Sequence, residues 1–147
     1  MCETKQQIKL NNLKFKKMST IKEKIGQAKK GENLDVLIKD ESWSVRRAVA
    51  WQGYGLDILL KDEDSYVRAA VVAQGYGLDI LLKDESEWVR AAVANQGYRL
   101  DILIKDESEY VRRTVAHQGY GLDELLKDES EWVRAAAQKK LNELKKN

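Results

Sequence analysis

The stretch LDILLKDESEWVRAAVANQGYR, residues 78–99, decides the architecture, because similar 22-residue stretches adjoin it on both sides. The five units start at Leu34, Leu56, Leu78, Leu100 and Leu122, without an insertion between them. A fixed period of this length is typical of a solenoid, in which each unit buries its apolar face only against its neighbours. The repeat therefore predicts an elongated surface, and surfaces of this kind mostly bind other molecules.

The composition of the 147 residues fits a single domain, with 43% hydrophobic and 34% charged residues. No apolar run approaches the roughly 20 residues that cross a bilayer, and the lysine-rich start has no signal-peptide pattern. Cys2 is the single cysteine, so the sequence predicts neither a disulfide nor a cysteine metal site. We expect a cytoplasmic protein that does not bind membranes.

Charge is distributed unevenly along the chain, although the net charge is only +2. Residues 1–33 hold nine lysines and three glutamates, whereas residues 34–138 hold 13 basic and 20 acidic residues. The end, from Lys139, adds four lysines and one glutamate. An acidic repeat region between basic ends could steer charged partners, or the lysines could simply keep flexible ends in solution.

These differences divide the chain into four predicted segments. They are a basic N-terminal arm over residues 1–17, an N-terminal capping helix over residues 18–33, the five-repeat solenoid over residues 34–138, and an extension of the C-terminal capping helix over residues 139–147. The arm is either disordered or an amphipathic segment that folds on a partner. In the first cap, Thr20 and Glu23 match a capping box and Gly31 ends the helix. Ile21, Ile25 and Ala28 of this helix are expected to cover the leucines of the first repeat.

Each unit is predicted to form a long helix, a glycine corner and a short second helix. In the third unit, Asp84 is the expected N-cap with Glu87 completing a capping box, and Gly97 ends the helix after about 12 residues. The segment LDILLK is too short for more than about one and a half turns, either α or 3₁₀. Its low content of β-branched residues disfavours a strand.

Helical spacing also predicts the core. Val89, Ala92, Val93 and Gln96 lie at i, i+3, i+4 and i+7, which places them on one face directed towards the core. The leucines at the first, fourth and fifth positions of each unit pack against this face from the short segment. The corner tyrosines are expected to stack on one another as part of the core, and they are Tyr54, Tyr76, Tyr98 and Tyr120.

An aspartate and an arginine recur in register in every unit. The aspartates are Asp40, Asp62, Asp84, Asp106 and Asp128, and the arginines are Arg46, Arg68, Arg90, Arg112 and Arg134. A bidentate ladder of these pairs between neighbouring units would satisfy both groups. A direct role of the arginines in binding a ligand such as phosphate is the alternative.

The pattern Asp84…Val89-Arg90, followed by a corner and a Leu-x-x-Leu segment, resembles the leucine-rich repeat variant family and, more distantly, short HEAT-like repeats. The resemblance covers residues 34–137 and implies an all-α, right-handed solenoid with one α-helix and one short helix per repeat. The chain departs from the family in two respects. It has no proline, and it lacks the cysteines that hold the iron–sulfur cluster of one branch.

Positions that vary between units are the best candidates for function, because the fold does not fix them. The eleventh, fourteenth and eighteenth positions line one face of each long helix, and stacking would join them into a strip. The predicted partner-binding residues are Trp43, Arg47, Trp51, Tyr66, Trp88, Asn95, Tyr110, Arg113, His117 and Trp132. Trp43 lies outside these three positions and is included as a further aromatic residue. Exposed aromatic residues with arginine are typical of protein-binding hot spots, although these rings could instead cover gaps between units.

The sequence offers no catalytic constellation. His117 is the single histidine, which leaves little for a Ser–His–Asp triad or a multi-histidine metal site. The GYGLD corner lacks the lysine of a phosphate-binding loop. We therefore expect a non-enzymatic module that binds another protein and needs no cofactor. The alternative is nucleic-acid binding through the basic arm and surface arginines, which the acidic repeat region disfavours.

Overall fold

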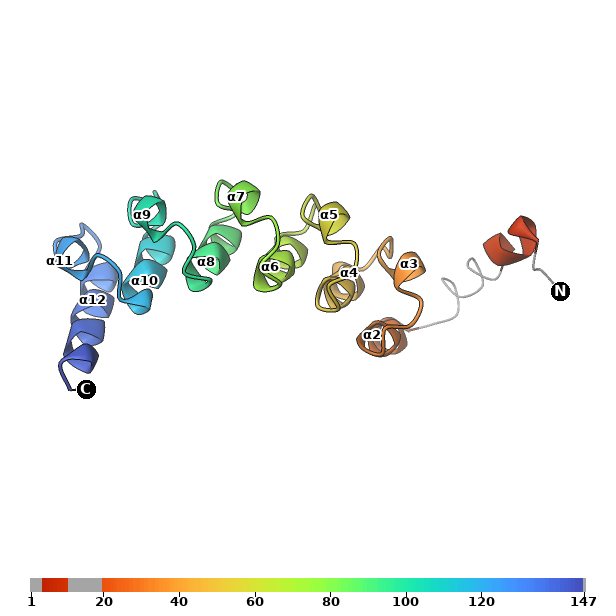
Figure 1. Cartoon of the computed structure of the whole chain (residues 1–147), viewed down its shortest axis with the longest axis horizontal. Helices are drawn as coiled ribbons and strands as arrows, with labels where there is room; N and C mark the ends of the chain where they lie inside the picture. The colour runs from red at the N-terminus through yellow and green to blue at the C-terminus, as the bar shows by residue number, and fades with distance from the viewer. Residues whose placement is uncertain (1–3, 11–19, 147) are drawn as a thin grey trace. The chain divides into compact units, whose positions relative to one another are not determined.

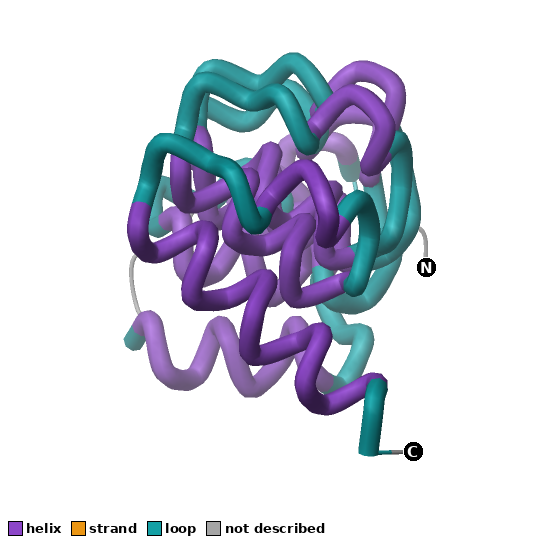
Figure 2. Tube along the Cα trace, turned by 90° about the vertical axis from the view of Figure 1, so that its left-hand side faces the viewer, coloured by secondary structure: helices purple, strands orange, loops and turns teal. Residues whose placement is uncertain are grey.

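The computed structural model describes residues 4–10 and 20–146, and it divides into two compact units, Met1–Gln74 and Gly75–Asn147. Regular structure in the described ranges is entirely helical, and Figure 2 shows helices and loops without a strand. The predicted all-α class is thus confirmed. None of these helices is both long and apolar enough to cross a membrane. Of the predicted arm, residues 5–10 form an exposed helix, and the rest lies outside the described residues except for Thr4.

After the helix over residues 5–10, the first compact unit contains α2 and then alternating short and long helices. They are α2 (Ile21–Lys29), α3 (Leu34–Leu37), α4 (Trp43–Ala50), α5 (Leu56–Leu59) and α6 (Ser65–Ala73). Helix α2 packs against α4, and α4 packs against α6, so that neighbours in sequence are neighbours in space (Figure 1). Thr20 caps α2 in the predicted capping box, because its Oγ1 accepts from the Glu23 N–H and the Glu23 carboxylate accepts from the Thr20 N–H.

The second unit repeats this alternation. It comprises α7 (Leu78–Leu81), α8 (Glu87–Asn95), α9 (Leu100–Leu103), α10 (Glu109–Gln118), α11 (Leu122–Leu125) and α12 (Glu131–Leu144). The long helices pack in chain order, α8 on α10 and α10 on α12 (Figure 1). The last helix runs through the position of the glycine corner, as the sequence predicted. The arrangement within each unit is that of a helical repeat.

The predicted N-caps of the long helices are wrong by two residues. Helix α8 begins after Ser86, and Asp84 lies before the cap, where its Oδ1 accepts from the Ser86 N–H at 2.9 Å. The helix is therefore 9 residues long rather than about 12. The N-caps of α10 and α12 are likewise shifted by two residues, to Ser108 and Ser130. Asp106 and Asp128, the counterparts of Asp84 in α10 and α12, lie before the cap because their carboxylates pair with Arg90 and Arg112 of the preceding repeat.

The core follows the predicted stripe only in part. Val89 and Val93 are fully buried, but Ala92 is half-buried and Gln96 is exposed. The buried face is instead extended by Ala94, which is fully buried. In α12 the equivalent residue is the exposed Gln138. A polar outer face of this kind is what a terminal repeat requires.

Two further core predictions are corrected. Tyr54, Tyr76 and Tyr120 are each about two-fifths exposed. The Tyr98 hydroxyl donates a hydrogen bond to Asp79. This hydrogen bond raises the pKa of Tyr98 above its ordinary value. In α2, Ala28 is fully buried and Ile25 half-buried as predicted, but Ile21 is exposed rather than packed on the first repeat. Lys24, which the sequence did not identify, is also buried.

The arginine ladder is confirmed for three pairs. Arg46 Nε and Nη2 donate to the two carboxylate oxygens of Asp62 at 2.7 and 2.9 Å. Its Nη1 donates to the carbonyls of Asp40 and Glu41 at 2.8 and 3.1 Å. The other confirmed pairs, Arg90–Asp106 and Arg112–Asp128, repeat this geometry. The hydrogen bonds to aspartate raise the pKa of all three guanidinium groups.

The two ends of the ladder differ. At the N-terminal end, Lys24 of α2 replaces the arginine and its Nζ donates to Asp40 at 2.7 Å, with both side chains buried. At the C-terminal end, Arg134 Nη1 keeps the two carbonyl contacts, to Asp128 and Glu129 at 2.7 and 2.9 Å. Arg134 remains partly exposed. The arginine role is therefore structural in the confirmed pairs.

The ladder predicts how stability depends on pH. The hydrogen bond from Arg112 holds the pKa of Asp128 below its ordinary value, so this carboxylate stabilises the folded state above the unfolded pKa of about 3.9. The contribution disappears as the pH falls through the lower folded pKa. We expect the difference in unfolding free energy between the wild type and Asp128→Asn to shrink below about pH 4. Urea unfolding between pH 7 and pH 2 measures it, and a constant difference would contradict this role.

Candidate functional site

In the first unit the structure brings three of the predicted residues together. Trp43 of α4 stacks on Tyr66 of α6, with ring centroids 5.2 Å apart and an interplanar angle of 30°. The Arg47 guanidinium lies over the Trp43 ring, 4.9 Å from its centroid. Arg47 is one helical turn after Trp43, which is the spacing that places two side chains on the same face. We call Trp43, Arg47 and Tyr66 the first aromatic cluster.

The second unit contains a related cluster. Trp88 of α8 lies against Tyr110 of α10, with ring centroids 4.7 Å apart and the planes tilted by 55°. The Arg113 guanidinium lies 5.3 Å from the centroid of Tyr110, again from the next turn of the same helix. Trp88, Tyr110 and Arg113 form the second aromatic cluster. In both clusters a ring pair joins neighbouring long helices and an arginine covers one ring.

The rings of the two clusters combine packing with exposure. Tyr66 and Trp88 each expose 53% of their surface, while Tyr110 is half-buried beneath Arg113. The rings therefore pack between neighbouring long helices and also present a face to solvent. Aromatic pairs and cation–π contacts each contribute about 1 kcal/mol. They hold the rings in defined positions, which favours recognition of a partner.

The remaining predicted residues are exposed but do not join these clusters. Trp51, Asn95 and His117 are exposed at the eighteenth position, near the C-terminal ends of their helices. Asn95 accepts a hydrogen bond from Gln118 at 3.4 Å. Trp132 of α12 is 67% exposed and makes no ring contact within the described ranges.

The short helices carry exposed isoleucines that were not predicted from the sequence. The third residue of the short helix is an isoleucine in three of the 22-residue repeats. Ile58, Ile80 and Ile102 expose 57%, 60% and 42% of their surface. The signal was present in the sequence, because a four-residue helix cannot bury three successive side chains on one side. Leu81 and Leu103 take the buried face, and the isoleucine beside each is left outside.

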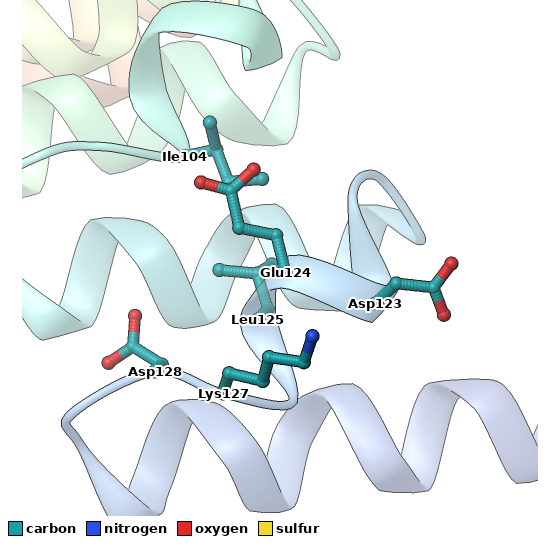
Figure 3. A pocket seen from close by; sticks show the side chains of 6 residues that line it. All are labelled: Ile104, Asp123, Glu124, Leu125, Lys127 and Asp128. Atoms are coloured by element: carbon teal, nitrogen blue, oxygen red, sulfur yellow. The ribbon is translucent and has the colours of Figure 1, made fainter.

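The second unit also contains a shallow cavity of about 500 Å³ beside α11 (Figure 3). It is lined by Ile104, Asp123, Glu124, Leu125, Lys127 and Asp128. Glu124 extends towards Ile104, whereas Asp123 points away (Figure 3). Asp128 is already paired with Arg112, so this cavity offers no converging set of free catalytic groups. Within the described ranges, no group of three or more His, Cys, Asp or Glu side chains could hold a metal ion.

Comparisons with known proteins add no assignment. No protein-family model matches the chain, and no curated protein matches it either. The functional argument therefore depends on the geometry of the two aromatic clusters and on Trp132.

Proposed function

We propose that this chain is a non-enzymatic module that binds another protein through the aromatic residues of its long helices. The observation that carries the proposal is the exposure of Tyr66, Trp88 and Trp132, each at 53% or more. Large aromatic side chains and arginine are enriched at the centres of protein interfaces. Rings already fixed by stacking lose little conformational entropy when a partner binds.

The fold that we propose for this function is the predicted right-handed solenoid of five repeats, of the leucine-rich repeat variant or HEAT-like type. The regular alternation of short and long helices in each unit supports it. In such a solenoid the variable positions of the long helices would form the contact surface. Neither a cofactor nor catalysis is part of this proposal, and a cytoplasmic location suits it.

Nucleic-acid binding is the alternative function. It has the support of lysines in the N-terminal arm, of which Lys5 and Lys9 are described and exposed. Against it stand the 20 acidic residues between residues 34 and 138. Binding to nucleic acid would weaken steeply with salt, because phosphate contacts release counterions. Absence of a mobility shift with DNA or RNA at low salt would remove this alternative.

The decisive experiment for the proposed function is affinity capture from the source cell with a double variant, Trp88→Ala/Tyr110→Ala. We expect it to lose its partners, because removing a hot-spot aromatic residue costs roughly 2 kcal/mol or more. The matched control is Ile80→Ala/Ile102→Ala, which removes exposed apolar surface from short helices of the same unit. Retention of every partner by the first pair would refute the proposed surface, and loss with the control pair alone would transfer the function to the short helices.

A further inference from the structure

Trp132 differs from the two aromatic clusters in that no arginine of the described residues covers its ring. In α4 and α10 an arginine from the next turn covers an aromatic ring, as Arg47 covers Trp43 and Arg113 covers Tyr110. In α12 the residue three positions after Trp132 is Ala135, which is exposed. The ring of Trp132 is therefore left open, and at 67% it is the most exposed large hydrophobic side chain in the described ranges.

The surroundings of Trp132 are acidic. Glu131 precedes it and is exposed, and Glu129, whose carboxylate pairs with Arg112 at 3.3 Å, exposes 86% of its side chain. The Glu109 carboxylate of α10 accepts a hydrogen bond from the Ser130 hydroxyl, which holds this third carboxylate beside the first turn of α12. Glutamates at a helix N-terminus also interact favourably with the helix dipole. That role does not account for an open indole beside them.

An open aromatic ring next to carboxylates is the environment that attracts a cation. The ring face interacts with the positive charge, and the carboxylates add Coulombic attraction and hydrogen-bond acceptors. Arg113 on Tyr110 shows this contact one repeat earlier in the same unit, with the guanidinium 5.3 Å from the centroid.

We propose that Trp132, with Glu109 and Glu131, receives an arginine side chain of a partner protein in the place that Arg113 takes on Tyr110. The inference rests on the proposed protein-binding function and names the chemistry of the partner, a segment rich in arginine. Arginine fits better than lysine because its planar guanidinium stacks on aromatic faces and pairs with carboxylates. His117 lies near the C-terminal end of α10 and Lys139 follows Trp132 by about two helical turns, whereas Arg113 lies in the middle of α10 with its guanidinium over Tyr110.

The test uses a hexa-arginine peptide as the probe and the full chain as the receptor. The four tryptophans give four indole N–H signals in a ¹⁵N-correlated NMR spectrum, and Trp132→Phe assigns the relevant one. We expect the Trp132 signal to shift with saturation, while the Trp43 signal, already covered by Arg47, does not. A hexa-glutamate peptide at equal ionic strength should leave Trp132 unchanged. Salt should weaken the binding, because exposed carboxylates are screened.

Variants then separate the ring from general electrostatics. Ala135→Arg places an arginine one turn after Trp132 and should weaken hexa-arginine binding roughly 3- to 10-fold, the size of one cation–π contact. Gln138→Arg adds the same charge on the same helix, away from the ring, and should weaken it less. Arg113→Ala uncovers Tyr110 and should strengthen binding about 2-fold or more.

The outcomes separate this inference from the proposed function. Equal affinity of the Ala135→Arg variant and the wild type, or no shift of the Trp132 signal, overturns the arginine site. If the Trp88→Ala/Tyr110→Ala pair still loses its partners in that case, the protein-binding function stands without it. Saturable binding at Trp132 together with retention of every partner by that pair would leave the arginine site and refute the proposed contact surface.

Discussion

Replacing Arg112 by alanine is expected to lower the free energy of unfolding by about 3 kcal/mol, because it leaves the Asp128 carboxylate buried without its counter-ion. The wild-type guanidinium donates to both oxygens of Asp128, at 2.7 and 3.0 Å, and to the carbonyls of Asp106 and Glu107. Urea unfolding followed by circular dichroism measures the loss. The slope of the transition should show that unfolding remains a single step.

Arg134→Ala is the matched control for this prediction. Arg134 makes the same two carbonyl contacts, but no following repeat supplies a carboxylate for its Nε and Nη2 within the described ranges. Its removal should cost about 1 kcal/mol or less, since water can replace its contacts. The double variant Arg112→Ala/Asp128→Ala should recover part of the loss, because it also removes the uncompensated charge. Equal losses for Arg112 and Arg134 would mean that the bridge between repeats contributes nothing.

Truncation of Leu103 to alanine is expected to cost about 2–4 kcal/mol, although it lies in a helix of only four residues. An isolated helix of this length is not stable, so α9 depends on packing rather than on intrinsic propensity. Leu103 is 1% exposed, and α9 packs against both α8 and α10. The leucine therefore connects the short helix to the two long helices of its unit.

The neighbouring Ile102 provides the control for Leu103. It belongs to the same helix but exposes 42% of its surface, so Ile102→Ala should cost less than about 1 kcal/mol. The two variants change helix propensity in a similar way, and their difference therefore reports burial. Thermal and urea unfolding of both variants should agree on the order. A larger loss for Ile102 would show that the exposed isoleucines stabilise the fold, and would remove them as a candidate surface.

The features that the sequence predicted well are those repeated in every unit. The long and short helices and the arginine ladder recur at a spacing of 22 residues, so that any local ambiguity is resolved by repetition. The N-caps of the long helices were harder to predict, because Asp106 and Ser108 are both good N-cap residues. The choice depends on the pairing of Asp106 with Arg90 of the preceding repeat, and the sequence of a single repeat does not show such a contact.

The sequence indicated which residues form the candidate surface, but not how their side chains contact one another. Periodicity placed Tyr66, Trp88 and Tyr110 in one column, yet it could not show which rings would pair. Pairing depends on how each helix is rotated against the next, which small shifts of the backbone decide. Ala91 is buried whereas Ala135 is exposed, although both occupy the fourteenth position of their repeats.

The confirmed arginine bridges run in one direction, each from a helix to the loop that follows in the next repeat, and this gives the molecule a polarity. Deleting repeats from the C-terminal side would leave an arginine without a following aspartate, and water can solvate that group. Deleting repeats from the N-terminal side would leave a buried aspartate without its cationic partner. A shortened chain would then need a substitute cation, as Lys24 supplies for Asp40, so new starting points are harder to create than new stopping points.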